Sequence, residues 1–303
     1  APPSHEWKVL LILALAFLAS EVGMRLFERH LSLDIAHIRD ATAIAREIGQ
    51  PATAHDVLVL GNSSSRAGIE PQILTQQLEL YGLRDARIHF FYPDGGNIGS
   101  WRWAWRRYFA PPMPQPDLVM VCGSRSHFDD IALDPVSSAS YFVSSKDSPS
   151  FLQSELHTLE GRLEFLISKA SVSFVNRHRV QRRFLDMIMP YNRKVLSEIS
   201  DHAALKVSAD GNARRGESSA RLAALLADLH AAGTPAAVVA LPAYVPYDVP
   251  DSRIAIVRDA SAKWIDLRAV PGIEREDFYD GAHVNHDGAV KLTTALAKAI
   301  ATP

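Results

Sequence analysis

Short apolar runs alternate with helical patterns over most of the 303-residue chain. Five of these runs are continuous rather than alternating, which is typical of parallel strands that are covered on both faces. Between them, apolar residues recur at the spacing of amphipathic helices. This alternation predicts an α/β fold in three layers around a five-stranded parallel sheet. The predicted strands are 57–60, 88–91, 118–122, 236–240 and 264–267, and the predicted helices are 71–81, 100–109, 218–232 and 288–301.

The N-terminal segment has a different pattern, because it is apolar on every side. Residues 9–20 carry no charge, and the wider stretch 7–27 is long enough to cross a bilayer. Twelve uncharged residues are also typical of the apolar region of a signal peptide, but we favour an uncleaved signal anchor. Because Lys8 precedes the apolar run, we expect a cytoplasmic N-terminus with the rest of the chain outside. Glu21 falls near the far interface. It lies at headgroup level or faces a protein partner, and the sequence leaves both open.

The pattern also predicts how the chain is organised. Apolar residues at helical spacing over 25–49 predict a helix that leads away from the membrane and stops at Gly49. A long gap separates the third and fourth predicted strands and contains a serine-rich loop and further helical pattern. The expected parts are a cytoplasmic N-terminus and transmembrane anchor (1–27), a helical linker (28–55) and a catalytic domain (56–303) with a helical insert at about 124–217.

Composition narrows the class of protein. The formal net charge is −2 and the pI is about 6.7, which argues against a nucleic-acid partner. The single cysteine, Cys122, lies inside a strand pattern and is expected to be a small core residue rather than a nucleophile. We expect no cofactor.

Candidate chemistry lies at the two ends of the predicted sheet domain. Ligands of open α/β sheets bind beyond the carboxyl ends of the strands. Ser63 follows the first strand, in the run Gly61-Asn62-Ser63-Ser64-Ser65. Asp280 and His283 precede the last helix, and Asp-x-x-His supplies the base and the orienting carboxylate that a serine nucleophile needs. The alternatives are structural: the serines cap a helix, and Asp280 to His283 form a turn and N-cap.

Together the two motifs resemble the SGNH/GDSL hydrolase superfamily. Its members begin with Gly-Asp-Ser after the first strand and end with Asp-x-x-His before the last helix. Here the blocks read Gly61-Asn62-Ser63 and Asp280-Gly281-Ala282-His283. The resemblance implies a flavodoxin-like sheet and a triad of Ser63 as nucleophile, His283 as base and Asp280 as orienter.

The middle blocks of that family match less closely. The glycine whose N–H helps to hold the oxyanion corresponds to Gly95 or Gly96, with Asn97 as a side-chain donor. Arg125 stands where the family has its oxyanion asparagine. It donates to an oxyanion, binds an acidic substrate group, or pairs with a carboxylate such as Asp129.

The anchor and the variant motifs resemble membrane-anchored SGNH proteins that modify cell-envelope polymers, such as the protein that completes D-alanylation of teichoic acids. The resemblance implies acyl transfer, acetyl above all, through a serine acyl-enzyme to an envelope glycan on the periplasmic side of the inner membrane. It implies a membrane-bound O-acyltransferase or other polytopic partner, and contact with membrane lipid. The alternatives are a carbohydrate esterase or deacetylase, and a catalytically silent scaffold or glycan-binding subunit.

Two further stretches have both a functional and a structural interpretation. Aromatic and basic residues at 100–109 suit a membrane interface or a sugar platform, or pack on the sheet. The basic cluster at 176–184 lies on anionic headgroups or a membrane partner, or is a solvated helix face. His283 and His286 with nearby acids suggest a metal weakly, and we expect none, because the triad already accounts for His283.

Overall fold

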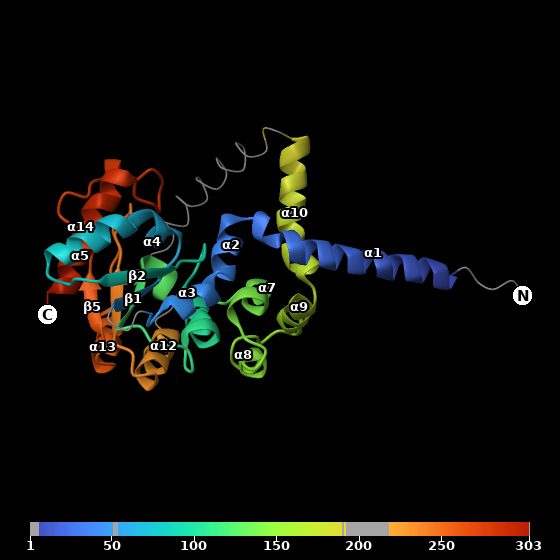
Figure 1. The fold of residues 1–303 in the computed structure, drawn as a ribbon, viewed down its shortest axis with the longest axis horizontal. Helices are drawn as coiled ribbons and strands as arrows, with labels where there is room; N and C mark the ends of the chain where they lie inside the picture. Colours follow the sequence, from blue (N-terminus) through green and yellow to red (C-terminus); the bar gives the residue numbers. More distant parts are fainter. Residues whose placement is uncertain (1–5, 51–53, 190, 192–217, 303) are drawn as a thin grey trace, which may run out of the picture. The chain divides into compact units, whose positions relative to one another are not determined.

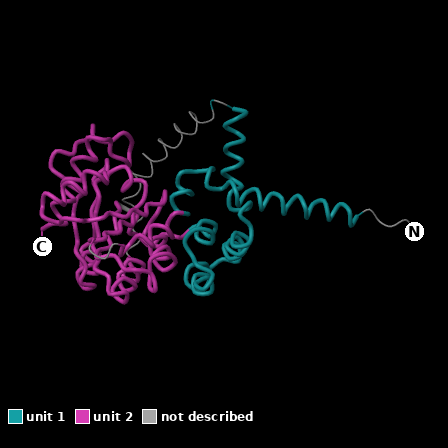
Figure 2. Tube along the Cα trace, viewed as in Figure 1, with its two compact units in different colours: residues 1–39, 134–193 teal, residues 40–133, 194–303 magenta. Residues whose placement is uncertain are grey.

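The computed structural model describes residues 6–50, 54–189, 191 and 218–302. The chain forms two compact units, and each unit consists of two segments that are separate in the sequence (Figure 2). Unit 1 comprises Ala1–Arg39 and Asp134–Arg193, and unit 2 comprises Asp40–Leu133 and Lys194–Pro303. Part of the predicted insert, 192–217, lies outside the described residues, and the domain boundaries expected from the sequence stay a prediction.

Unit 2 is built on one sheet of five parallel strands (Figure 1). The strand order is β2-β1-β3-β4-β5, the flavodoxin-like order. The central strand β1 pairs with β2 on one side and with β3 on the other, so Leu60 lies beside Phe91 and Val121. The predicted α/β fold with a five-stranded parallel sheet is confirmed. The strands are β1 (His55–Leu60), β2 (Ala86–Phe91), β3 (Leu118–Gly123), β4 (Ala236–Ala240) and β5 (Lys263–Asp266).

Helices cover both faces of this sheet. On one face, α5 (Pro71–Leu80) and α14 (His286–Ala301) pack against each other and share a core cluster with Val59 and Met120. Side chains alternate along a strand, so the neighbouring Leu58 points to the opposite face. There α6 (Ile98–Ala104) packs against α12 (Ala220–Ala231). The remaining elements of unit 2 are α3 (Ala41–Glu47), α4 (Ser63–Gly68), a π-helical turn (Trp105–Phe109), the 3₁₀ turns η3 (Arg125–Phe128) and η5 (Arg275–Asp277), and α13 (Asp251–Asp259).

The aromatic stretch predicted as the helix 100–109 belongs to the core. Trp101, Trp103 and Trp105 are each at most 1% exposed. The interpretation of this stretch as a sugar platform or membrane surface is therefore wrong, and the packing interpretation holds. Its last turn widens into a π-helix, which keeps both Trp105 and Phe109 buried.

Unit 1 consists of helices. The predicted continuous helix 25–49 is wrong, because the chain breaks into separate turns after α1. The first break is a 3₁₀ turn, and the next is a cap in which the Ser32 hydroxyl accepts a hydrogen bond from Asp34 N. The elements are α1 (Glu6–Phe27), η1 (Glu28–His30), α2 (Leu33–Arg39), α7 (Pro135–Ser137), a π-helical turn (Ser138–Phe142), α8 (Ser148–Ser154), α9 (Leu159–Ala170) and α10 (Val172–Ile188).

The N-terminal helix has the length and composition of a membrane span. Residues Glu6–His30 form one helical stretch. An 18-residue window within it has a mean hydropathy of 2.0, and 6% of this window is buried. Apolar side chains along α1, among them Leu10, Leu13 and Phe17, are exposed. An exposed, uniformly apolar helix of this length is what a bilayer accommodates.

Candidate active site

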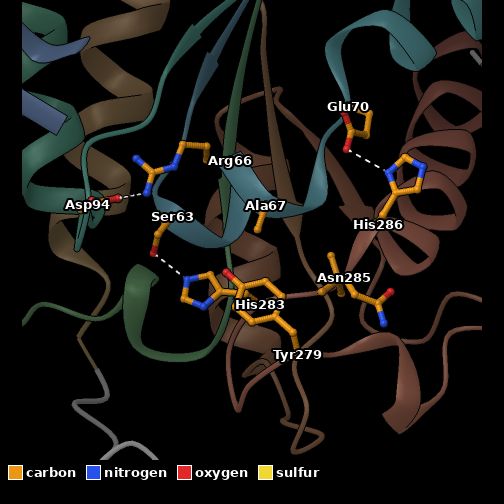
Figure 3. Close-up of a pocket in the computed structure, with 10 residues that line it drawn as sticks. Ser63, Arg66, Ala67, Glu70, Asp94, Tyr279, His283, Asn285 and His286 are labelled. Carbon is orange, nitrogen blue, oxygen red and sulfur yellow. Dashed lines mark hydrogen bonds and ion pairs between the residues drawn. The ribbon is translucent and has the colours of Figure 1, made fainter. Parts of the chain in front are cut away.

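The corner after β1 places the candidate nucleophile. Asn62 is the N-cap of α4, and its side-chain oxygen accepts hydrogen bonds from Ser64 N at 3.0 Å and Ser65 N at 3.4 Å. The Ser65 hydroxyl donates to the Cys122 carbonyl oxygen at 3.1 Å. Asn62 therefore caps the helix, and Ser65 is used inside the corner. Ser63, the first residue of α4, directs its hydroxyl into the pocket (Figure 3).

Close packing holds this corner in place. A Cβ atom added at Gly61 would lie 2.5 Å from the Ser65 hydroxyl oxygen, so only glycine fits without movement. The buried indole of Trp101 donates to the Gly61 carbonyl oxygen at 2.6 Å. The Asn62 side-chain amide donates to the Gly96 carbonyl oxygen at 3.2 Å, which ties the corner to the loop after β2. Such buried, satisfied hydrogen bonds fix the position of Ser63.

Ser63, His283 and Asp280 lie in one hydrogen-bonded line. The distance from His283 Nε2 to Ser63 Oγ is 3.0 Å, and the distance from His283 Nδ1 to Asp280 Oδ2 is 2.8 Å. Both fall within the range for a nucleophile, its base and the group that orients the base. Ser63 and His283 are 220 positions apart in the chain, and the sheet brings them together because the loops after β1 and β5 both leave its carboxyl edge.

The Asp280 carboxylate is held in its charged form. Burial raises its pKa, but hydrogen bonds from the His283 ring and from the backbone N–H groups of Ala282 and His283 outweigh burial. The pKa of Asp280 is therefore lowered from its ordinary value. An ionised Asp280 favours the proton on His283 Nδ1, which leaves Nε2 free to accept the Ser63 proton.

The loop that carries Asp280 and His283 is braced on both sides. Phe278 and Val284 form an antiparallel bridge across it. Asn285 caps α14 through a hydrogen bond from Gly288 N at 3.0 Å. The N-cap of the last helix is thus Asn285, so the expected N-cap within Asp280 to His283 is wrong. The expected turn is present, because the Asp280 carboxylate accepts hydrogen bonds from Ala282 N and His283 N.

The triad opens into a pocket of about 750 Å³. Figure 3 shows Ser63 and His283 facing each other, with Arg66 and Asp94 at one side and the second histidine, His286, at the other. The lining is mixed polar and apolar. It consists of Ser63, Arg66, Ala67, Glu70, Asp94, Tyr279, His283, Val284, Asn285 and His286.

Three contacts shape the rim of this pocket. Arg66 and Asp94 form an ion pair at 2.6 Å. His286 Nδ1 lies 3.5 Å from Glu70 Oε1, and among the described residues no group of three or more histidine, cysteine or acidic side chains is placed to hold a metal ion. The Tyr279 ring stacks on the His283 ring, with centroids 5.5 Å apart and an angle of 9° between the planes.

Among these rim residues the sequence singled out His286 but gave it no role in the pocket, whereas it missed Arg66, Glu70 and Tyr279, although some signals were present. Arg66 lies one helical turn after Ser63, so it projects on the same side of α4. Tyr279 directly precedes Asp280. Nothing local, however, pairs Arg66 with Asp94 or Glu70 with His286, because the sheet brings those partners together.

The candidate oxyanion donors are placed differently from the triad. Gly96 N–H donates to the Pro93 carbonyl oxygen at 3.0 Å, and the Asn97 side-chain oxygen caps α6 by accepting from Gly99 N and Ser100 N. Neither Gly96 nor Asn97 is among the described residues that line the pocket. Their role as oxyanion donors stays a prediction.

Arg125 is the first residue of η3, directly beyond β3, and its side chain lies outside what the structure describes. Asp129, its suggested carboxylate partner, pairs with Arg253 at 2.5 Å. The Cys122 thiol is fully buried, and burial raises its pKa, which fits a core residue.

No protein-family model matches the chain. DNA polymerase I of Thermus aquaticus is 34% identical over 101 residues, which are 33% of this chain and 12% of the polymerase. The chain thus spans about an eighth of the length of that curated relative, and the match transfers no activity.

Solved structures with a similar arrangement include two hydrolases. The acetylxylan esterase Axe2 of Geobacillus stearothermophilus has a TM-score of 0.42 and 10% identity, with coverage of 81% of this chain and 94% of the esterase. The α/β hydrolase LAE5 from the metagenome of Lake Arreo has a TM-score of 0.35 and 12% identity at the same coverage. Both TM-scores are below 0.5, so neither similarity assigns a function to this chain.

Proposed function

We propose that this protein is a serine acyl-ester enzyme that forms an acyl-enzyme on Ser63. One observation carries the proposal: the His283 ring bridges the Ser63 hydroxyl and the Asp280 carboxylate at 3.0 and 2.8 Å. A hydroxyl, an imidazole and an ionised carboxylate in this order make a weak nucleophile reactive near neutral pH.

The proposed reaction has two halves. In the first, His283 Nε2 takes the Ser63 proton while Oγ bonds to the acyl carbonyl carbon. The bond from that carbon to the leaving alcohol then breaks, and His283 returns the proton to the leaving oxygen. In the second, water or a sugar hydroxyl loses its proton to His283 and attacks the acyl-enzyme, and Ser63 recovers its proton. Asp280 orients the imidazole and stabilises its cation throughout.

The proposed polymer is a glycan and the proposed acyl group is acetyl: the glycan accepts acetyl in transfer and carries it in deacetylation. The pocket of about 750 Å³ lies within the size range of small-molecule sites. Charged and amide side chains of the pocket offer hydrogen bonds to sugar hydroxyls.

The finer part of the proposal is transfer rather than hydrolysis, on the periplasmic side of the inner membrane. The apolar helix α1 supports a single-pass anchor. A membrane-bound O-acyltransferase or another polytopic protein would then supply the acyl group, and an envelope polysaccharide would accept it. Simple deacetylation of the glycan is the second candidate, because the same acyl-enzyme reacts with water.

The test supplies purified full-length protein with an activated acetyl ester, with and without acetylated and unacetylated oligosaccharides. The proposal predicts acetate release or sugar acetylation by the wild type and neither by Ser63→Ala. Ser64→Ala is the matched control, because Ser64 contributes its backbone N–H to the corner. A mass gain on the sugar indicates transfer, and acetate alone indicates esterase activity. If Ser63→Ala matches the wild type, the acyl-enzyme proposal is wrong and a scaffold role is favoured.

A further inference from the structure

The one carboxylate in the middle of the apolar α1 surface is bound by unit 1 itself. Glu21 is 6% exposed. Its oxygens accept hydrogen bonds from the Ser171 hydroxyl, from Val172 N at 2.9 Å and from Ser173 N at 3.1 Å. These groups form the N-terminus of α10, where the helix dipole favours a negative charge. Glu21 therefore faces protein from its own chain.

Further contacts at the same level hold α1 against the corner between α9 and α10. The hydroxyls of Ser20 and Ser173 lie 3.0 Å apart, and Arg25 donates to the Ala170 carbonyl oxygen at 3.5 Å. In Figure 1, α10 crosses α1 rather than running alongside it. The corner at 170–173 is thus fixed at one depth along the apolar helix.

That depth follows from the helix rise. Lys8 is the last charged residue before the apolar run, so it marks one edge of the hydrocarbon layer. From Lys8 to Glu21 an α-helix rises roughly 20 Å. The hydrocarbon core is about 30 Å thick, so Glu21 and the corner that binds it lie short of the opposite edge.

The outer face of α9 has the composition expected at that depth. Phe165 is buried inside unit 1, whereas a stripe of aliphatic side chains on the opposite side of α9 is between 45% and 74% exposed. Helices at the surface of soluble proteins instead place charged and polar side chains on their exposed face. The stripe, which we call the α9 stripe, consists of Leu159, Leu163, Leu166 and Ile167.

The neighbouring helix has the charge that fits lipid headgroups. α10 carries Arg177, Arg179, Arg182 and Arg183 against one acidic residue, Asp186, although the whole chain has a net charge of −2. Arg177 also lies over the Phe174 ring at 3.7 Å. Arginines beside exposed apolar side chains are typical of helices that lie in the interface of anionic membranes.

We propose that the α9 stripe inserts among the acyl chains of the outer leaflet, while α10 lies at the boundary between acyl chains and headgroups and its arginines extend to the headgroups. This inference rests on the proposed anchor α1 and goes beyond it, because a single span leaves the attached unit free to tilt. A span and an interfacial helix joined through Glu21 would hold unit 1 in one orientation on the membrane. The proposed occupant of the stripe is lipid.

The test places an environment-sensitive dye at single positions of the full-length protein in phosphatidylcholine–phosphatidylglycerol nanodiscs. Leu166→Cys reports on the stripe and Leu13→Cys on the anchor. Leu80→Cys, 78% exposed on α5, is the control for an exposed leucine in unit 2. The buried Cys122 stays unlabelled in the folded protein. A nitroxide high on the lipid acyl chain, or iodide in the water, quenches each dye.

The proposal predicts that the lipid nitroxide quenches the Leu166 label strongly and the Leu80 label weakly, with the reverse order for iodide. If the Leu13 label is in lipid but the Leu166 label behaves like the Leu80 label, this inference is wrong and the proposed anchor is retained. If the Leu13 label is in water, both the proposed anchor and the insertion of the α9 stripe are wrong. If the Leu166 label is protected from iodide only when a membrane protein co-purifies with the chain, lipid is not the occupant of the stripe.

Discussion

In the proposed mechanism, Asp280 carries the charge that makes His283 a base. The titration of the Asp280 carboxyl group can be measured through the stability of the protein. Its pKa is lowered in the folded protein, since hydrogen bonds from His283 and the backbone outweigh the opposing effect of burial. A lowered folded-state pKa adds stability that is fully present above the unfolded value, about 3.9, and is lost as the pH falls through the folded value.

We therefore predict that Asp280→Asn is less stable than the wild type at pH 6 and that the difference shrinks below about pH 3.9. Urea unfolding at a series of pH values measures it. Asp248→Asn, at an exposed aspartate outside the triad, is the control. A stability difference that is constant from pH 6 to pH 3 contradicts the assigned hydrogen bonds.

Tyr279 is a positioning residue in this account, because its ring stacks on the proposed base. Tyr279→Ala removes the stack, and Tyr279→Phe keeps it. We expect kcat of the alanine variant to fall by about 2- to 10-fold, in line with the worth of an aromatic pair. The phenylalanine variant should retain the wild-type kcat.

Steady-state kinetics over a pH series separate this role from sugar binding. A rise in KM alone in Tyr279→Ala, with kcat and its pH profile unchanged, would assign the ring to the substrate. A loss shared equally by both variants would assign the effect to the hydroxyl group.

At the scale of elements, α13 is joined to the loop after β3 by a buried charge. Arg253 is 4% exposed, pairs with Asp129 at 2.5 Å and donates to the Ser219 hydroxyl at 3.1 Å. Removing one partner of a buried pair leaves the other charge uncompensated, which costs about 3–5 kcal/mol.

We predict that Arg253→Met lowers the free energy of unfolding of the protein by about 3 kcal/mol. Arg258→Met, an exposed arginine later in the same helix, should change it by less than about 0.5 kcal/mol. Denaturant titration compares the two variants. Equal effects of the two substitutions would show that the Arg253 pair contributes nothing beyond an ordinary surface charge.

The elements that were predictable from the sequence are those with a strong local pattern. All five strands and the terminal helix α14 were visible as apolar runs and helical spacing, although β1 and β2 each begin two residues earlier than predicted. The helix α13 was missed, because only Arg253 and Val257 of its nine residues are buried. The break after α1 was missed because η1 and α2 keep a helical spacing of apolar residues.

The residues of the site also differ in whether a local pattern made them predictable. Ser63 lies in a short motif after β1, and Asp280 and His283 lie in a short motif just before α14, so the sequence was enough to name them as candidates. The rim pairs and the bonds to Glu21 join residues far apart in the chain, such as Glu21 and Ser171, and only folding brings them together.

At the scale of the whole molecule, the chain alternates between its two units. Unit 1 holds the apolar helix and the α9 stripe, and unit 2 holds the triad. In the proposed function, unit 1 binds the membrane and unit 2 catalyses the acyl-ester reaction on an envelope glycan.

The central claim is that Ser63 is an activated nucleophile. The most direct measurement is intact mass after reaction of the purified full-length protein with a fluorophosphonate, beside Ser63→Ala and Ser64→Ala. The account predicts a single adduct on the wild type and on Ser64→Ala, and none on Ser63→Ala. A folded wild type that forms no adduct, or an adduct that persists in Ser63→Ala, would contradict it.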